Sequence, residues 1–96
     1  MPQNPDRKGY EFPKRIKKLV IERSNRMCEW PQGCLERGRF IDHITSIKIS
    51  RLLNGGIPDP SIKSEENAQY LCDWHNKAKT FIENWMTLQL EKQIAS

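Results

Sequence analysis

The sequence predicts a small α+β domain that begins with a basic helix and ends with a long one. Apolar residues recur at helical spacing after Pro13 and again after Asp73, which favours two amphipathic helices. Two short runs, 39–44 and 69–72, contain the β-branched and aromatic residues typical of strands. Pairs of cysteine and histidine residues flank these runs, so we expect a bound metal to hold a thin core together.

The N-terminal region divides at Pro13. Residues 1–12 hold two prolines, one glycine and no apolar period, so we expect a mobile basic arm there. Pro13 suits the first position of a helix, because its φ is already helical and its missing N–H is not needed there. Ile16 and Val20 then share one face, and the spacing predicts a basic amphipathic helix over 13–25.

The chain length allows a single domain over 13–96, with its core at about 27–83. Only 36% of the 96 residues are hydrophobic and 29% are charged. A domain of this size buries about 60–65% of its unfolded surface and often needs a metal, disulfides or a partner for stability. Because cysteines number three, an odd count, a closed disulfide framework is disfavoured and metal binding is favoured.

The distribution of charge and hydropathy predicts a cytoplasmic protein with an anionic partner. No apolar run approaches the roughly 18 residues of a membrane helix, and the polar N-terminus does not look like a signal peptide. The formal net charge is +4, and ten of the sixteen Lys and Arg residues precede residue 41. Nucleic acid is therefore the first candidate partner, although a solvated helix face would also explain the charge. The candidate phosphate contacts are Lys14, Arg15, Lys17, Lys18 and Lys79, with Arg7 and Lys8 in the arm.

The middle and the end of the chain alternate turns with regular structure. Turn-forming residues are dense over 28–38, and the long loop over 44–66 is of a length that is usually functional. Asp73 is expected to cap a helix that continues to about residue 93. We expect one face of this helix, with Phe81, Trp85 and Leu88, to pack into the core.

Two pairs of soft ligands form a candidate zinc site. Cys28 and Cys34 lie on the turn-rich segment, and Cys72 and His75 lie where the second strand passes into the last helix. Three thiolates and one imidazole would complete a tetrahedral, closed and therefore structural Zn²⁺ site. The alternative is that these cysteines are small buried residues and that His75 is an ordinary helix-face histidine.

A second set of polar residues predicts hydrolytic chemistry. Asp42 and His43 end the first strand, Asn67 precedes the second, and Asn76 lies in the first turn of the last helix. Asp42 and Asn76 carry the hard oxygen ligands that Mg²⁺ or Mn²⁺ prefers. The imidazole of a histidine such as His43 can accept a proton at neutral pH, so the set is sufficient for metal-assisted phosphodiester hydrolysis.

With these motifs the chain resembles the HNH endonucleases, whose ββα-metal site is often embedded in a zinc-binding treble clef. The matching stretches lie between residues 28 and 83 and include 40–44, 55–56 and 67–80. The small size and basic arm look like compact HNH proteins of bacteriophages and prophages, which would place the protein in the host cytoplasm. The resemblance thus implies a zinc-stapled ββα-metal domain with nuclease activity.

The resemblance also implies a role for each site residue. His43 is the general base, Asp42 is a ligand of the catalytic metal, and Asn67 braces the loop that orients His43. Relatives commonly show Cys-x-x-Cys-His before a Lys-Thr pair. This chain has His75 in place of the second cysteine and Asn76 in place of the histidine. The three family positions are then His43, Asn67 and Asn76, which makes the chain an H-N-N variant. The competing register assigns His75 to the catalytic metal and leaves zinc with three cysteines.

Three functions stay open from the sequence. The first is a divalent-metal-dependent DNA endonuclease or nicking enzyme. The second is a zinc-stapled nucleic-acid-binding module without catalysis, which would need neither Asp42 with His43 nor Asn67. The third is a packaging adaptor that contacts phage packaging proteins. We expect a monomer or a weak dimer.

Overall fold

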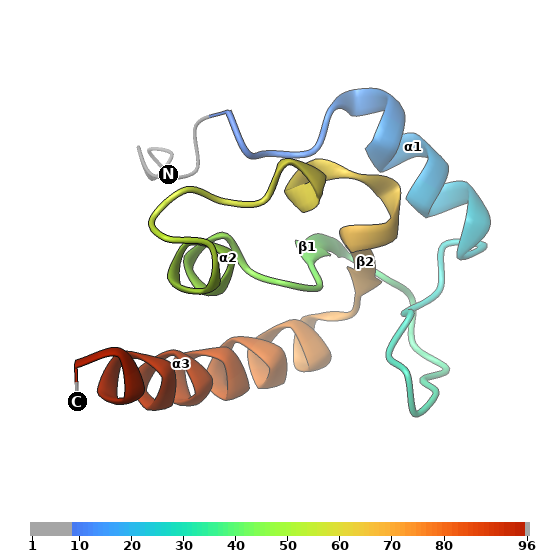
Figure 1. Cartoon of the computed structure of the whole chain (residues 1–96). Helices are drawn as coiled ribbons and strands as arrows, with labels where there is room; N and C mark the ends of the chain where they lie inside the picture. The colour runs from blue at the N-terminus through green and yellow to red at the C-terminus, as the bar shows by residue number, and fades with distance from the viewer. Residues whose placement is uncertain (1–8, 96) are drawn as a thin grey trace.

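The chain folds as a small α+β domain, as expected, in a computed structural model that describes residues 9–95. Three α-helices and one two-stranded antiparallel sheet make up this range (Figure 1). In chain order the elements are α1 (Lys14–Arg23), β1 (Phe40–His43), α2 (Ile47–Leu53), the 3₁₀ turns η2 (Pro60–Lys63) and η3 (Glu65–Asn67), β2 (Ala68–Leu71) and α3 (Asp73–Ala95).

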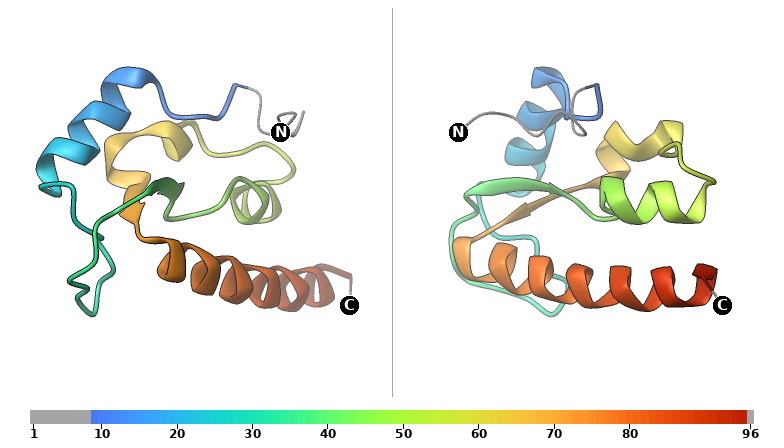
Figure 2. Two further views of the ribbon diagram at one scale, coloured as in Figure 1. Left: turned by 180° about the vertical axis from the view of Figure 1, so that it is seen from behind. Right: turned by 90° about the vertical axis from the view of Figure 1, so that its left-hand side faces the viewer.

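The sheet lies between α1 and α3 and positions the rest of the domain. Strands β1 and β2 pair antiparallel, with Phe40 opposite Leu71 and His43 opposite Ala68. Helix α1 packs against β2 on one side, and α3 crosses below both strands on the other (Figure 2). The C-terminal end of β1 therefore meets the beginning of β2 close to α3.

Helix α1 has the amphipathic form that its sequence predicts. It begins at Lys14, one residue after Pro13, which occupies the N-cap. Ile16 and Val20 are buried against Phe12 and Ala68, and they form the larger of two small hydrophobic clusters. Because the buried positions repeat every four residues, the intervening lysines and arginine face solvent.

The boundary between arm and domain lies earlier in the chain than we expected. We expected a mobile arm over 1–12, but Phe12 is only 4% exposed and belongs to the core. Its ring also stacks on His43, with centroids 4.2 Å apart and planes 22° apart. The end of the expected arm thus contributes to the fold, while residues 1–8, with Arg7 and Lys8, lie outside the described residues.

The turn-rich segment forms a short hairpin, which we call the knuckle (residues 26–38). Met27 pairs with Arg37, and the Cys28 N–H donates to the Glu36 carbonyl at 2.9 Å. Gly33 turns the chain with φ of +95°, a conformation that other residues rarely adopt. A side chain at Gly38 would meet the Tyr70 ring at 2.3 Å, so only glycine lets the knuckle approach β2.

Our expectation for the apolar face of α3 is wrong. Phe81, Trp85 and Leu88 are 76%, 59% and 55% exposed, and the buried residues of the helix are Lys79 and Thr87. The helix therefore turns a polar face toward the sheet and an apolar face toward solvent. Within residues 9–95, no helix is both long and apolar enough to cross a membrane.

Replacing Phe12 with alanine should test its place in the core. Removing a buried phenylalanine costs about 3–5 kcal/mol, because apolar burial is lost and a cavity remains. We expect Phe12→Ala to lower the free energy of unfolding by about 3 kcal/mol in urea titrations of the zinc-loaded protein. Phe40→Ala is the matched control at a partly exposed position, and an equal loss in both variants would contradict this assignment.

Candidate functional site

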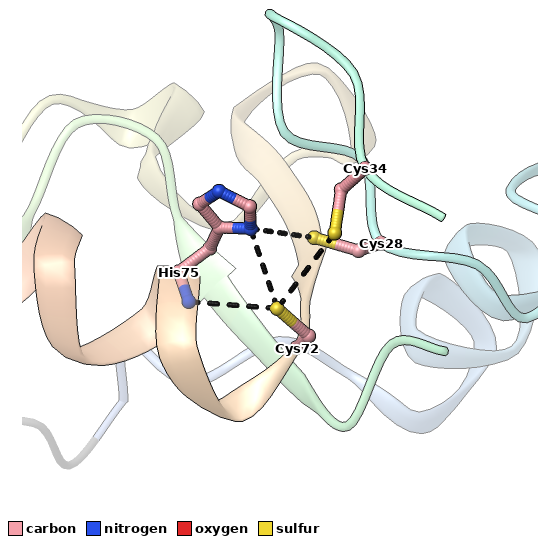
Figure 3. Close-up of side chains that lie close together, drawn as sticks. All are labelled: Cys28, Cys34, Cys72 and His75. Carbon is pink, nitrogen blue, oxygen red and sulfur yellow. Dashed lines mark hydrogen bonds between the residues drawn. The ribbon is translucent and has the colours of Figure 1, made fainter. Parts of the chain in front are cut away.

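Cys28, Cys34, Cys72 and His75 converge into one cluster, as the sequence predicts (Figure 3). One ligand atom from each residue lies within 4.8 Å of all the others. His75 Nδ1 is 3.6 Å from Cys28 Sγ and 3.3 Å from Cys72 Sγ, and Cys34 Sγ is 4.0 Å from Cys72 Sγ. The four side chains are therefore close enough to bind a single metal ion.

The spacing of these atoms fits zinc. Bond lengths of about 2.3 Å to sulfur and 2.0–2.1 Å to nitrogen give a tetrahedron whose edges are about 3.5–3.8 Å. The distances of 3.3, 3.6 and 4.0 Å scatter around those edges. Three thiolates and one imidazole fill a tetrahedron and leave no position for substrate, which is consistent with a structural zinc.

Two separate parts of the chain supply the ligands. The knuckle carries Cys28 and Cys34, whereas Cys72 and His75 lie at the junction between β2 and α3 (Figure 3). The backbone N–H of His75 donates to Cys72 Sγ at 3.5 Å, which fixes the first turn of α3 around the sulfur. Trp30 stacks on the His75 ring with centroids 4.6 Å apart, and Trp74 meets it edge-on.

The thiols of the cluster differ in acidity. Burial opposes ionisation of Cys72, but the His75 N–H and the neighbouring thiols outweigh it and hold the pKa of Cys72 below its ordinary value. A hydrogen bond to the Glu36 backbone lowers the pKa of Cys34, but desolvation and the other two thiols outweigh it and raise that pKa. A bound cation favours the thiolate form of its cysteine ligands.

Asp42 and Lys79 form a second polar cluster on the α3 side of the sheet. Lys79 Nζ lies 3.0 Å from Asp42 Oδ2 and donates to the His43 carbonyl at 2.6 Å. The same ammonium pairs with Glu83, one turn further along α3. Lys79 is 9% exposed, so this cation is shared between two carboxylates in a nearly buried position.

The surroundings of His43 determine which ring nitrogen carries a proton. The side chain is 2% exposed, and its Nε2 lies 2.8 Å from the carbonyl oxygen of Tyr10. Because a carbonyl can only accept a hydrogen bond, Nε2 carries a proton and donates it to this bond. The stack on Phe12 holds the ring in this orientation.

Asn67 fastens the loop that follows His43. Its Oδ1 accepts from the Thr45 N–H at 2.8 Å, and its Nδ2 donates to the carbonyls of Thr45 and Ile62. Its backbone carbonyl accepts from the Ile44 N–H at 2.8 Å. The side chain and the backbone carbonyl of Asn67 therefore hold Thr45 and Ile44, the two residues that follow His43.

A cavity of about 550 Å³ opens beside these residues. Asp42 and His43 line it together with residues of α2 and with Thr80, Glu83, Asn84 and Thr87 of α3. Asn76 is partly buried one turn before Thr80, whose Oγ1 donates to the Asn76 carbonyl at 3.0 Å. The amide of Asn76 thus shares a helix face with the cavity, although Asn76 is not part of its lining.

The expected phosphate contacts separate into two groups. Lys14, Arg15, Lys17 and Lys18 are all exposed on α1. Lys79 is different, because its ammonium is buried and held by Asp42 and Glu83. The structure thus removes Lys79 from the surface set and places it beside the candidate catalytic residues.

Several partners of the site residues were not anticipated from the sequence. The carbonyl of Tyr10 and the ring of Phe12 reach His43 from more than 30 positions away, and no local pattern predicts such contacts. Glu83 stands four residues after Lys79, which is a typical helical ion-pair spacing and a usable signal. Trp30 lies two residues after Cys28, but nothing in the sequence indicates its stack on His75.

Comparison with known proteins adds no assignment. No protein-family model matches the chain, and neither does a curated protein or a solved structure. Function must therefore be inferred from the chemistry of the described side chains.

Substitutions at two neighbouring residues should separate the two polar clusters. His75→Ala removes a ligand from the Cys3His cluster, so we expect loss of bound zinc and a lower melting temperature. Asn76→Ala leaves that cluster intact and should keep one equivalent of zinc and nearly the wild-type melting temperature. Elemental analysis and thermal melts of both variants measure this. If His75→Ala kept its zinc and its stability, the roles of the two residues would have to be exchanged.

Proposed function

We propose that the protein is a divalent-metal-dependent DNA endonuclease or nicking enzyme of the HNH type, with a ββα-metal site. The observation that carries this proposal is the position of Asp42 and His43. They end β1 beside a cavity, β2 follows, and α3 begins at the Cys3His cluster with Asn76 in its first turn. This order and these residue types are what the HNH resemblance requires.

His43 is the general base in this proposal. Its Nδ1 takes a proton from a water molecule as that water attacks phosphorus, while Nε2 keeps its hydrogen bond to Tyr10. The stack on Phe12 and the bonds from Asn67 to the following loop hold the imidazole in one orientation. A fixed base loses little entropy on reaching the transition state.

Asp42 and Asn76 would hold the catalytic cation, which we propose to be Mg²⁺ or Mn²⁺. Carboxylate and amide oxygens suit both ions. When bound, such an ion supplies positive charge that stabilises the developing negative charge on phosphate oxygens. Before the cation binds, the ammonium of Lys79, which is shared with Glu83, holds the carboxylate of Asp42 in place.

DNA binding in this proposal rests on α1. Its four exposed cations, Lys14, Arg15, Lys17 and Lys18, present positive charge along about one turn and a half of helix. Contacts from such side chains to phosphates position a duplex without reading its sequence. We therefore propose double-stranded DNA as the substrate, with low sequence specificity.

One observation favours a second candidate, a zinc-stapled DNA-binding module or packaging adaptor without catalysis. The ammonium of Lys79 lies between the carboxylates of Asp42 and Glu83, where a bound cation would compete with it. If that ion pair is permanent, Asp42 cannot serve as a metal ligand. Cleavage assays separate the two candidates.

The first test is nicking of supercoiled plasmid by the zinc-loaded protein with added Mg²⁺ or Mn²⁺. We expect activity that EDTA abolishes, and a loss of about 10²–10⁴-fold in His43→Ala, because a general base contributes that much. His43→Gln should lose as much activity, since its amide can donate to Tyr10 but cannot accept a proton from water.

Asn84→Ala is the matched control, because Asn84 lines the same cavity and has no assigned role. Circular dichroism and zinc content establish that each variant is folded. Wild-type cleavage by folded His43→Gln would refute the proposed base. No cleavage by wild-type protein with either ion would leave the binding module as the function.

The second test concerns the basic face of α1. Each phosphate contact contributes about 0.9 to the slope of log Kobs against log salt. Replacing Lys14, Arg15, Lys17 and Lys18 with glutamine should therefore flatten that slope by up to about 3.6 and weaken all duplexes equally. The control variant neutralises four exposed cations elsewhere, Arg26, Arg37, Arg39 and Lys63. An unchanged slope in the quadruple variant would assign phosphate contact to another surface.

A further inference from the structure

An apolar stripe runs along the solvent side of α3. Trp74, Phe81, Trp85 and Leu88 are between 55% and 76% exposed. Figures 1 and 2 show α3 along the lower edge of the molecule in three views about one vertical axis, with the sheet and α2 above it. Within residues 9–95, no helix or strand covers this side of α3.

The spacing of the stripe is that of a helix that pairs with another helix. Its positions are separated alternately by four and three residues through the whole of α3, in the order Trp74, Ala78, Phe81, Trp85, Leu88, Lys92 and Ala95. This is the a and d spacing of a coiled-coil seam, and its positions are apolar over two heptads, from Trp74 to Leu88, before Lys92 interrupts them. A helix that packs on a globular core usually shows a broader apolar face. The residues that α3 buries within its own domain are instead Lys79 and Thr87.

We propose that α3 pairs with α3 of a second copy of this chain, antiparallel and about a two-fold axis midway between Phe81 and Trp85. A second copy is self-complementary at such an axis, as two-fold dimers require. The proposal concerns assembly and does not depend on the nuclease proposal.

The side chains of the stripe match in size across that axis. Phe81 faces the partner's Trp85. The pair related to it by the two-fold axis, Trp85 with the partner's Phe81, completes a central aromatic cluster. Ala78, one of two alanines in the repeat, faces the partner's Leu88. Trp74 faces the partner's Lys92, whose aliphatic stem and ammonium both suit the face of an indole ring.

Charge selects the antiparallel direction. Lys77 and Glu91 lie on the same flank of the stripe, and their side chains are 75% and 45% exposed, respectively. The midpoint between these two positions lies within one residue of the proposed axis. In an antiparallel pair Lys77 meets the partner's Glu91 twice. In a parallel pair Lys77 would face the partner's Ile82 instead. Their present partners, Asp73 and Lys48, are exposed ion pairs that contribute little and do not prevent this exchange.

The area of the stripe is sufficient for a specific dimer. The surface area of an aromatic side chain is about 150–250 Å². Trp74, Phe81 and Trp85 are 70%, 76% and 59% exposed, respectively. Together they therefore expose about 400 Å² in each copy. Two copies bury about 800 Å² from these residues alone. Leu88, Ile82 and the stems of the flanking residues bring the total to about the 1,000 Å² expected of a specific interface.

Sedimentation equilibrium of the zinc-loaded full chain tests the dimer. We expect wild-type protein to dimerise and Trp85→Lys to raise the dissociation constant by about 30-fold or more, as for a central aromatic residue of an interface. Ile94→Lys is the matched control, because Ile94 is 61% exposed on the same helix but lies outside the repeat. A wild-type monomer at several hundred micromolar, or equal effects of the two substitutions, would overturn the proposal.

Charge reversal tests the direction of pairing. Lys77→Glu and Glu91→Lys should each weaken the homodimer several-fold, since like charges then meet twice. A mixture of the two single variants should restore the wild-type dissociation constant, because every cross-chain pair in the heterodimer is again of opposite charge. Failure of the mixture to recover, with both variants folded and zinc-loaded, would overturn the antiparallel arrangement.

Discussion

The Cys3His cluster is the constraint on which the rest of the structure depends. It joins the knuckle to the junction of β2 and α3, two segments separated by more than 30 residues. The second hydrophobic cluster consists of Leu71 with Cys28 and Cys72, so two residues of the Cys3His cluster also form part of the core. Removing a metal from such a domain removes folding energy directly. The position of α3, and hence of Asn76 and Lys79, follows from this junction.

A second set of polar bonds completes the fold around the sheet. Arg23 at the end of α1 pairs with Glu29 of the knuckle, and Glu29 accepts from the Tyr70 N–H of β2 at 2.9 Å. The bond to Glu29, opposed in part by burial, raises the pKa of Arg23 above its ordinary value, so the guanidinium stays charged. The candidate site at the end of β1 is therefore held by α1 on one side and, on the other, by the junction that carries Cys72 and His75.

The sequence was informative where structure depends on local chemistry. Prolines, glycines and short β-branched runs correctly predicted both strands and the first and last helices, and the ligand pairs predicted the Cys3His cluster. Helix α2, however, lies in the segment that we expected to be a long loop. Periodicity showed that α3 has an apolar face, but it does not show whether that face meets the core or solvent. Lys79 is buried because Asp42 and Glu83 compensate its charge, and the Asp42 contact is set by tertiary structure. The same holds for Phe12 on His43.

The central claim is that Asp42 binds a catalytic cation in place of the Lys79 ammonium. Titration of Mn²⁺ into the zinc-loaded protein, followed by electron paramagnetic resonance, tests it without requiring DNA. We expect one Mn²⁺ per chain, bound at least about tenfold more weakly by Asp42→Asn, because a charged oxygen ligand is lost. Zinc content should be the same in both proteins. If the wild-type protein bound no Mn²⁺, or if Asp42→Asn bound it equally well, the account of this site as a metal-dependent nuclease centre would be contradicted.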